Sequence, residues 1–372
     1  MTPAEEPQGS GRARAQDGQP PQADPTSPEL IEVLPQHRFD PQPLVQWLRP
    51  RLGDAFDGQL RIRQFQGGQS NPTYHLGTNV GDHVLRKKPP GHLLPSAHAV
   101  EREYRVMKAL AGSGVPVPRM LDLCEDDQVI GTAFFVMQHV PGRLMGSRFA
   151  EHGPLAERLA LNDDLVRVLA ALHRVDWRAA GLEGFGRPDR YFERQTARWA
   201  TQWEAARTEP AADMEALRGW LESHLPADGE AAIVHGDYRL GNVLVHPGQP
   251  RVAAVLDWEL ATIGHPLADL AYLCVGHYLP PEEGGCVGAD LAALGIPTQA
   301  ECVARYCAHA QREVPVDFER YVVFSMFRLA SICAGVYKRA LDGNAADTRA
   351  LGFRERFRCI AAAGWQLARR SG

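Results

Sequence analysis

The stretch IVHGDYRLGNVLVH, residues 233–246, places a carboxylate, a guanidinium and an amide between two short apolar runs. These groups belong to Asp237, Arg239 and Asn242, and a further apolar run ends at Asp257, fifteen residues after Asn242. A turn between buried strands needs only a glycine and one Asp or Asn. The last apolar run of the stretch and the run before Asp257 predict a β-hairpin, which would bring Asn242 and Asp257 to the same end of its ladder. The fold must therefore present several polar side chains at one end of a short hairpin.

Phosphoryl transfer from ATP requires this set of side chains. The Asp237 carboxylate can orient an acceptor hydroxyl and take its proton, while the Asn242 amide and the Asp257 carboxylate offer oxygen ligands to Mg²⁺. Arg239 supplies a cation near the transferring phosphoryl group. Each residue alone is compatible with a hairpin that ends in polar side chains, but their joint spacing favours a catalytic role.

Length and composition are those of a globular protein with one large domain or two lobes. The chain has 372 residues, of which 44% are hydrophobic and 23% are charged, so it can bury a sizeable core. A net charge of -5 gives no basic surface for nucleic acid or for an anionic membrane. We therefore expect a small-molecule partner, and neither nucleic acid nor a membrane.

Cysteine usage and hydropathy predict a cytoplasmic protein. The seven cysteines are scattered singly and no CxxC pair occurs, which is typical of reduced thiols in a core and gives little support to a zinc site made of cysteines. No segment contains the run of about 18 apolar residues that a membrane span requires. The N-terminal residues also lack the apolar stretch of a signal peptide.

The residue pattern divides the first part of the chain into two segments. Residues 2–29 contain no Val, Ile, Leu, Phe, Trp or Tyr, so residues 1–29 are predicted to be a disordered tail. Residues 30–141 alternate between apolar and polar side chains, which predicts a small antiparallel sheet of five strands with one helix, capped by Ser96. The predicted strands are 59–65, 73–76, 83–86, 115–124 and 130–140.

Residues 142–372 have the periodicity of helices. Leucines recur from Leu155 to Leu172, and Trp199 and Trp203 lie four residues apart. Further helices are predicted at 194–206, 265–277, 298–311, 318–341 and 346–369. The predicted fold class is therefore α+β, with a small sheet-rich N-lobe and a larger helical C-lobe.

Two segments carry a family resemblance. HGDYRLGNVLV followed by VLDWELATIGHPLADLAYL closely resembles the aminoglycoside phosphotransferase and choline kinase group, which shares the bilobal fold of protein kinases. The resemblance covers roughly residues 40–365 and is strongest at 231–273. It implies that the N-lobe binds the nucleotide, that the C-lobe carries the catalytic loop and the acceptor-binding helices, and that the cofactors are ATP and Mg²⁺.

The resemblance also implies roles for residues of the catalytic loop. Asp237 corresponds to the catalytic base of the family, and Asn242 and Asp257 correspond to its magnesium ligands. Asp269 resembles the acidic residue that braces the catalytic loop from the following helix, and His235 belongs to the same bracing. These two residues are expected to support the loop without taking part in the chemistry.

The nucleotide should lie against the loop between the first two predicted strands and against a hinge. Gly67, Gly68 and Ser70 occupy the place of the phosphate-covering loop of a kinase, although their spacing is not GxGxxG and a Gly-Gly turn can be only a turn. The hinge residues whose main chain is expected to contact adenine are Met137, Gln138 and Val140.

The third predicted strand should carry the cation for the nucleotide phosphates. Arg86 stands where the family has lysine, and a shifted register would place Lys88 there instead. Arginine can hold phosphate oxygens bidentately, so activity need not be lost. Glu103 is the expected partner, with Glu101 as a second choice. Arg86 and the irregular glycine loop leave open a pseudokinase, which would bind nucleotide without turnover.

The acceptor is expected to be a small molecule with a hydroxyl group. Residues 266–372 hold eleven acidic and twelve basic side chains, a balance that disfavours a polycationic aminoglycoside. Arg328 lies on an apolar face, where it can either pair with a structural carboxylate or anchor an anionic group of the acceptor. The residues expected to contact the acceptor are Arg194, Arg198, Trp199 and Arg328.

Three further segments resemble a narrower group. VLRKKPPGHLLPSAHAVEREY, the stretch 181–204 and FRLASICAGVYKRALDG are most similar to the kinase-like domain found fused to some acyl-CoA dehydrogenases. This resemblance implies a hydroxyacyl group, or its CoA thioester, as the acceptor. Choline, homoserine, sugar and aminoglycoside kinases are the competing assignments.

Overall fold

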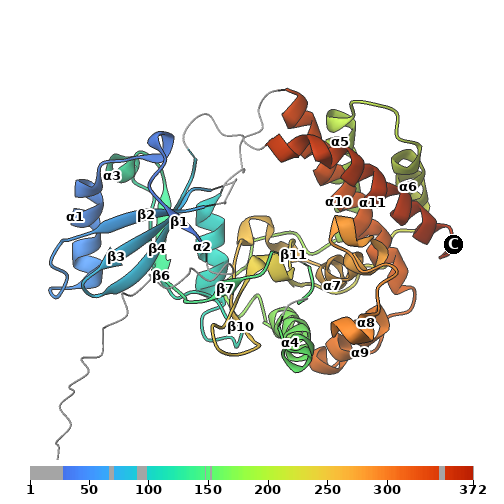
Figure 1. Ribbon diagram of the computed structural model, residues 1–372, viewed down its shortest axis with the longest axis horizontal. Coiled ribbons are helices and arrows are strands. Elements are labelled where there is room, and N and C mark those ends of the chain that lie inside the picture. The colour runs from blue at the N-terminus through green and yellow to red at the C-terminus, as the bar shows by residue number, and fades with distance from the viewer. Residues whose placement is uncertain are drawn as a thin grey trace, which may run out of the picture.

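A six-stranded antiparallel sheet forms the smaller lobe of the computed structural model, which describes residues 28–66, 71–89, 99–146, 148–150, 153–342 and 348–371. The strand order is β1-β2-β3-β4-β6-β5 (Figure 1). The strands are β1 (Leu30–Ile31), β2 (Arg61–Phe65), β3 (Thr73–Thr78), β4 (Gly81–Lys87), β5 (Met120–Cys124) and β6 (Phe134–Gln138). Most of the tail predicted at 1–29, and the predicted Ser96 cap, lie outside the described residues.

Alternation along β4 directs its side chains to the two faces of the sheet. Leu85 belongs to the same buried cluster as apolar residues of α1 (Pro41–Leu52) on one face. Val84 belongs to a second cluster, together with residues of α2 (Val100–Ala109), on the other face. Because Arg86 lies two residues after Val84, the strand period places its side chain on the face that α2 covers.

Helix α1 is absent from the sequence prediction, which gives this lobe one helix. The Asp40 side chain accepts a hydrogen bond from the backbone N–H of Gln42 at 3.0 Å and caps the helix, and Gly53 ends it with a φ of 81°. Pro41 suits the first helical position, but Pro50 lies inside the helix and interrupts the helical pattern of the sequence. The prolines therefore weaken the helical pattern of the sequence, although capping and burial stabilise this helix in the fold.

Two strands of the smaller lobe are shorter than predicted. The predicted strands 115–124 and 130–140 correspond to β5 and β6. The short helix α3 (Asp127–Ile130) takes up the start of the second predicted strand, because Asp126 caps it by accepting from Gln128 N–H at 2.9 Å. The two-residue strand β1 adds a sixth strand to the predicted five. The predicted α+β class with two lobes is confirmed.

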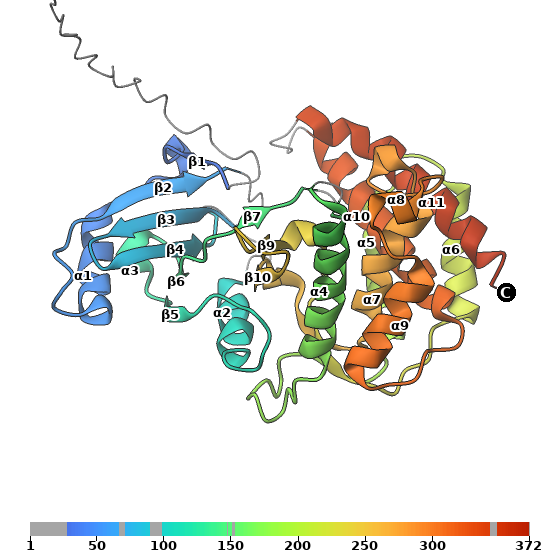
Figure 2. The ribbon, with the colours of Figure 1, turned by 60° about the horizontal axis from the view of Figure 1, so that its bottom comes forward.

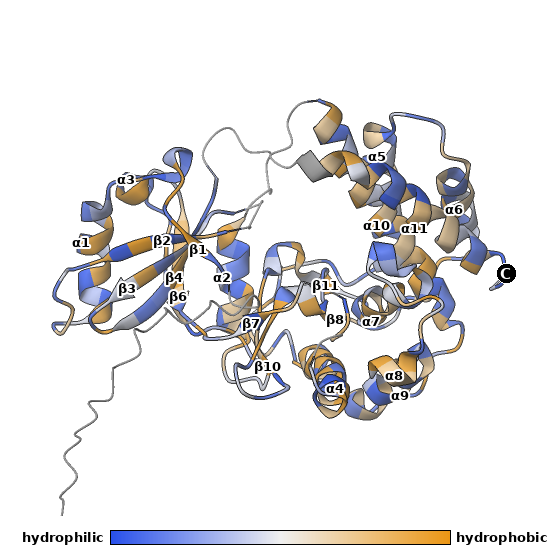
Figure 3. Cartoon of the chain, in the orientation of Figure 1, coloured by the Kyte–Doolittle hydropathy of each residue, from blue (hydrophilic) through white to orange (hydrophobic). Residues whose placement is uncertain are grey.

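Helices of the described residues make up most of the larger lobe (Figure 2), and hydrophobic and hydrophilic residues both recur along them (Figure 3). They are α4 (Leu155–His173), α5 (Tyr191–Ala206), α6 (Ala212–Ser223), α7 (Leu267–Cys274), α8 (Leu291–Leu294), α9 (Gln299–Ala310), α10 (Phe318–Leu341) and α11 (Phe353–Ala368). Helix α10 has its predicted bounds, whereas α6 and α8 are not among the predicted helices. In the described part of the chain, no helix is both long and apolar enough to cross a membrane.

Two small sheets lie between the large sheet and the helices (Figures 1 and 2). Strands β9 (Val243–Val245) and β10 (Val252–Val255) pair antiparallel, which confirms the predicted hairpin, and β7 (Arg143–Leu144) pairs with the other edge of β9. Strand β8 (Ala232–Val234) pairs with β11 (Thr262–Gly264). The polar stretch of the sequence is thus the loop that connects two small sheets at the junction of the lobes.

Burial of His265 predicts a pH dependence of stability. The ring lies 5.2 Å from that of Phe192 and 5.4 Å from that of Tyr321. Burial, with smaller contributions from Arg312 and His173, lowers the pKa of His265 from 6.5 to about 4. Between these two pH values the unfolded chain binds a proton that the folded chain does not, so the free energy of unfolding should fall as pH falls from 6.5 to 4. The expected loss is about 3 kcal/mol.

Chemical denaturation of the wild type and of His265→Gln between pH 4 and pH 7.5 checks this expectation. Burial raises the pKa of Glu103 to about 7, which produces a slope of opposite sign in the same window, so only the difference between the two proteins is informative. The difference should grow as pH rises from 4 to 6.5 and then become constant. A difference that does not depend on pH would show that His265 titrates normally in the folded protein.

Candidate active site

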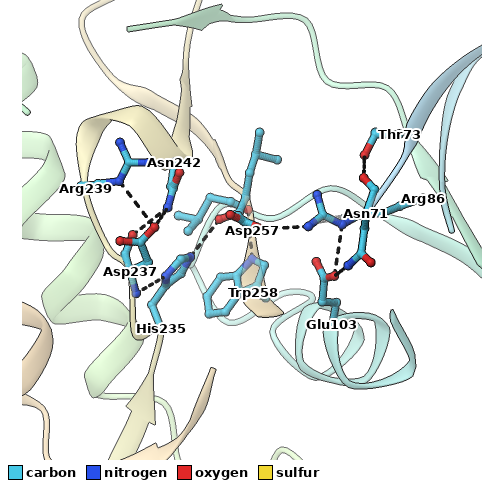
Figure 4. Close-up of polar contacts among 12 residues, drawn as sticks. Asn71, Thr73, Arg86, Glu103, His235, Asp237, Arg239, Asn242, Asp257 and Trp258 are labelled. Carbon is cyan, nitrogen blue, oxygen red and sulfur yellow. Dashed lines mark hydrogen bonds and ion pairs between the residues drawn. The ribbon is translucent and has the colours of Figure 1, made fainter. Parts of the chain in front are cut away.

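Asp237 lies in the loop between β8 and β9 and is held by the end of that loop (Figure 4). The amide nitrogen of Asn242 donates to the Asp237 carboxylate at 2.6 Å and to its backbone carbonyl at 2.9 Å. Arg239 Nε lies 3.5 Å from the same carboxylate. A 3-10 turn at Leu240–Asn242 reverses the chain, so three residues that are close in the sequence meet around one carboxylate.

Asp269 on α7 holds the start of the loop. Its carboxylate accepts hydrogen bonds from the backbone N–H of His235 at 2.6 Å and of Gly236 at 2.9 Å, and it lies 3.4 Å from His173 Nε2. Burial alone would raise the pKa of Asp269, but the His173 hydrogen bond and the nearby charges and N–H groups hold it below the ordinary value. At Gly236 the φ is 85° and an added Cβ would lie 2.8 Å from the Leu260 carbonyl oxygen, so only glycine fits there.

His235 connects the loop to the strand that delivers Asp257. Its Nε2 lies 2.9 Å from the Leu256 carbonyl oxygen, and its Nδ1 accepts from the Asp237 backbone N–H at 3.1 Å. Both contacts are satisfied by a neutral ring that carries its proton on Nε2. The ring also packs 4.6 Å from that of Trp258. His235 and Asp269 together fix the backbone on either side of Gly236.

Asp257 follows β10 and faces the smaller lobe (Figure 4). It adopts a left-handed conformation, with a φ of 66°, which Asp tolerates better than most residues. The backbone N–H of Leu256 donates to the Asn242 carbonyl at 2.9 Å, so Asn242 and Asp257 flank the same end of the hairpin, as the sequence predicts. Asp257 Oδ1 lies 2.7 Å from Arg86 Nη2, an ion pair that joins the two lobes.

Arg86 and Lys88 have different carboxylate partners. Arg86 Nε lies 3.1 Å from Glu103 Oε1, and Glu103 is 1% exposed. Lys88 forms its ion pair with Glu101. The unshifted register of β4 therefore places Arg86, and not Lys88, in the pair with the buried glutamate. Burial raises the pKa of Glu103 to about 7, although Arg86 acts in the opposite direction.

A pocket of about 190 Å³ opens between the sheet and β9, beside this ion pair. Its walls are mainly apolar, and Arg86, Glu103 and Asp257 line one part of it. The predicted hinge residues Met137, Gln138 and Val140 all line the pocket. The backbone N–H of Gln138 is already paired, because it donates to the Arg119 carbonyl at 2.8 Å. Val140, two residues later in the hinge, also carries a backbone N–H. The predicted loop residues Gly67, Gly68 and Ser70 lie outside the described residues.

A second pocket, of about 250 Å³, is lined by Gly236 of the loop between β8 and β9 and by residues of the larger lobe and of α2. Three of the predicted acceptor residues, Arg198, Trp199 and Arg328, line it together with Gly236. Arg194 is not among the lining residues, and its guanidinium donates to the Arg187 carbonyl at 2.6 Å. The other lining residues are Arg102, Tyr191, Gln195, Glu259, Leu260, Ala261 and Thr262.

Arg328 reaches this pocket from the middle of α10. It is 8% exposed and donates a hydrogen bond to the Gly236 carbonyl, and its guanidinium carbon lies 5.4 Å from the Trp199 ring. Glu259 lines the same pocket as Arg328. The buried indole N–H of Trp199 has no hydrogen-bond partner among the described residues.

Two residues at the site were not singled out from the sequence. Asn71 donates to Glu103 Oε1 at 3.0 Å (Figure 4), and its place directly after the glycine turn was the available signal. Tyr272 is buried beside Asp237, and burial together with that carboxylate raises its pKa to about 12. Tyr272 lies three residues after Asp269, on the same helix, so it shares a face with the bracing carboxylate.

A small antiparallel sheet, a larger helical lobe and a catalytic loop at their junction define a kinase-like phosphotransferase fold. The model of the phosphotransferase enzyme family matches residues 61–312. The chain belongs to this family, whose class of activity is phosphoryl transfer to a small molecule.

Relatives extend the family assignment to most of the chain. Acyl-CoA dehydrogenase family member 10 of Mus musculus is 42% identical over 332 residues, which are 88% of this chain and 31% of that protein. The chain thus spans about a third of the length of this relative. A crystal structure from Ralstonia eutropha, whose assignment as an aminoglycoside phosphotransferase is provisional, is 44% identical, with a TM-score of 0.82, and covers 90% of this chain and 99% of its own.

A more distant structure shares only the fold. A thermostable mutant of an aminoglycoside phosphotransferase, crystallised with AMP-PNP and hygromycin B, is 16% identical with a TM-score of 0.58 and covers 84% of this chain and 95% of its own. The family model, the acyl-CoA dehydrogenase relative and the Ralstonia eutropha structure together confirm the resemblance to the phosphotransferase group and to the kinase-like domain of acyl-CoA dehydrogenase relatives.

Proposed function

We propose that the protein transfers the γ-phosphoryl group of ATP, with Mg²⁺, to a hydroxyl of a small molecule. The observation that carries this proposal is the arrangement of Asp237, Asn242 and Asp257 at one end of the β9–β10 hairpin. Asp237 directly follows Gly236, which lines the second pocket, and Asp257 lines the nucleotide pocket. We propose that Asp237 orients an acceptor hydroxyl and takes its proton while the phosphoryl group approaches from the other lobe.

The side chains at the hairpin end fit a magnesium ion. The Asn242 amide donates its nitrogen to Asp237, which directs its oxygen away from that carboxylate, and the Asp257 carboxylate is 36% exposed. Amide and carboxylate oxygens are the ligands that Mg²⁺ prefers. When bound, Mg²⁺ would neutralise charge on the β and γ phosphates. Arg86, aligned by Glu103, would hold α and β phosphate oxygens, and Arg239 would offset charge at the transferring group.

The apolar pocket is the proposed adenine site. Met137 and Val140 line it from the hinge, and the main chain at Val140 is the proposed contact to the adenine edge. A more distant member of the same fold binds AMP-PNP, which supports nucleotide as the phosphoryl donor here. The pocket ends at Arg86 and Asp257, so a nucleotide with its base at the hinge would direct its phosphates toward Asp237.

The proposed acceptor is a hydroxyacyl group or its CoA thioester, and the second pocket is its proposed site. Three arginines and one glutamate line that pocket, namely Arg102, Arg198, Arg328 and Glu259. This balance suits an anionic acceptor better than a polycation such as an aminoglycoside. The similarity to acyl-CoA dehydrogenase family member 10 supports an acyl acceptor. Choline, homoserine and sugars are the alternatives to test.

We also propose a cytoplasmic location. All seven cysteines are free and six of them are buried, which suits a compartment that keeps thiols reduced.

Magnesium-dependent ATP consumption over a panel of acceptors tests the proposal. The panel contains short and long hydroxyacids, their CoA thioesters, choline, homoserine, sugars and kanamycin, with Asp237→Asn as the blank. We expect consumption above the blank with a hydroxyacyl compound and little with kanamycin. Consumption with choline, homoserine or a sugar alone would correct the acceptor class. Silence across the panel, with Mg·ATP still raising the melting temperature, would favour the pseudokinase, and silence without ATP binding would refute the assigned nucleotide site.

A further inference from the structure

Three potential metal ligands gather on the sheet outside the phosphotransfer site. His75 on β3, Asp82 on β4 and His139 directly after β6 each offer one ligand atom, and these atoms all lie within 4.8 Å of one another. His75 Nε2 lies 3.5 Å from Asp82 Oδ2. Asp82 is near the start of β4, whereas Arg86 is near its end, so the cluster and the phosphate-binding cation occupy opposite ends of the strand.

The register of the sheet brings these residues together. Strands β3, β4 and β6 are neighbours in this order. Gly77 pairs with Asp82, so His75, two residues before Gly77, shares a face with Asp82. The backbone N–H of His139 donates to the Asp82 carbonyl at 3.1 Å, so His139 lies opposite Asp82 on the other neighbouring strand. The cluster therefore follows from backbone pairing and does not depend on one rotamer alone.

The surroundings of the cluster hold the rings but leave access from solvent. Phe65 stacks on His139 with ring centroids 6.5 Å apart and meets the His75 ring edge-on at 6.3 Å. The side chain of His75 is 14% exposed and that of Asp82 is 54% exposed. Two imidazoles are thus partly desolvated while the carboxylate faces water, which leaves an entry path for an ion.

We propose that His75, Asp82 and His139 bind a zinc ion. Two imidazole nitrogens and one carboxylate oxygen, with water as a fourth ligand, form a common open zinc site. Mg²⁺ prefers oxygen ligands only, so the cluster is distinct in chemistry from the Asn242 and Asp257 pair. The distance of 3.5 Å between His75 Nε2 and Asp82 Oδ2 is close to the distance between two ligand atoms on one tetrahedral ion. The His139 side chain needs a small movement to complete the site.

Zinc at this cluster would affect the hinge. His139 lines the nucleotide pocket next to Met137 and Val140, so an ion that joins His139 to His75 and Asp82 would fix the hinge against the β3–β4 hairpin. Binding itself does not depend on the proposed phosphotransfer, because none of the three ligands belongs to the catalytic loop. Failure of the zinc site and failure of the proposed function are therefore separable.

Calorimetric titration of the full chain with Zn²⁺, in the presence of millimolar Mg²⁺, tests the proposal, and visible absorption with Co²⁺ reports the coordination geometry. We expect one Zn²⁺ per chain that Mg²⁺ does not displace, and the absorption of a four-coordinate Co²⁺ site. Loss of an outer-shell partner alone weakens metal binding by about 10–100-fold, so His75→Ala and Asp82→Asn, which each remove a direct ligand, should weaken it at least about 100-fold.

His246→Ala is the control, because His246 lies at the end of β9 and outside the cluster. It should leave the Zn²⁺ affinity unchanged. Asp82→Asn keeps the shape of an exposed side chain, so it reports on binding even if His75→Ala fails to fold. No saturable Zn²⁺ binding by the wild type, or equal affinities in the wild type and Asp82→Asn, would overturn the proposal.

Discussion

Replacing Asp237 with asparagine is expected to lower kcat by about 10²–10⁴-fold, the usual contribution of a general acid or base. Asparagine has the same shape and still offers an oxygen to the Asn242 amide, which donates to the aspartate at 2.6 Å in the wild type. It cannot take a proton from the acceptor. The loop should therefore keep its conformation while proton transfer is lost, and the KM for ATP should change little.

Initial rates with the acceptor that the panel identifies, together with melting temperatures with and without Mg·ATP, measure this effect. Asp342→Asn is a matched control, since Asp342 pairs with Lys338 on the surface at 2.7 Å and lies on α10's C-terminal side. The control should have wild-type rates. A normal kcat in Asp237→Asn would remove Asp237 from the catalytic role, whereas lost nucleotide binding would mean that the substitution disturbs the loop.

The catalytic loop could be predicted from the sequence because its geometry is local. Asp237, Arg239 and Asn242 lie within six residues, and a single hairpin brings Asp257 to them. The choice between Arg86 and Lys88 stayed open in the sequence, because both lie on the same face of the strand, and only the register of β4 and the ion pairs of the structure resolve it. These inferences need only short-range periodicity, which one sequence contains.

The proposed acceptor pocket is harder to predict because it depends on long-range packing. It joins α2, α5, the catalytic loop and α10, and no local pattern fixes how these elements meet. Tyr191, Gln195, Arg198 and Trp199 line it at spacings of four, three and one, which define one stripe of α5. Arg194 falls just outside that stripe. The sequence indicated the segment 181–204 as a candidate, but the face of α5 that lines the pocket follows only from the packed structure.

Helices α1 and α6 show a second limit of sequence reasoning. Both were absent from the prediction, and both are short helices that bury only two or three side chains. In α1 these are Leu44 and Leu48, and in α6 Met214, Leu217 and Leu221. All of them are fully buried at spacings of three or four, but so few residues make a weak periodic signal until a partner surface is known. Tertiary packing, and not local propensity, determines these helices.

The ion pair between Arg86 and Asp257 connects the proposed nucleotide-binding residues to the proposed metal ligands. Arg86 contacts the buried Glu103 at 3.1 Å and Asp257 at 2.7 Å, so one guanidinium spans both lobes. A lysine has a single ammonium and cannot present two separate nitrogens in this fixed fork. The arginine that departs from the family pattern therefore suits a bridging role, in which nucleotide phosphates would compete with Asp257 for its Nη2 group.

Replacing Asp257 with alanine is expected to lower kcat by about 10³-fold, because loss of metal electrostatics costs several kcal/mol of transition-state stabilisation. The change removes a proposed Mg²⁺ ligand and leaves Arg86 paired with Glu103 only. Nucleotide affinity in the presence of Mg²⁺ should fall, while the affinity for ATP without Mg²⁺ should fall less or rise, because Arg86 is released. Asp257→Ala should thus differ from Asp237→Asn, which is expected to preserve Mg·ATP binding.

Melting temperatures with ATP, with and without Mg²⁺, separate the two effects, since a ligand that binds the folded state stabilises it by an amount that grows with its concentration relative to Kd. Asp317→Ala is a matched control: Asp317 also has a left-handed backbone, with a φ of 57° against 66° at Asp257, but it starts α10 and is 56% exposed. Alanine therefore incurs a similar backbone cost at both positions. We expect the magnesium-dependent part of the shift to disappear in Asp257→Ala and to persist in Asp317→Ala. Equal magnesium-dependent shifts in both variants would show that Asp257 is not a metal ligand.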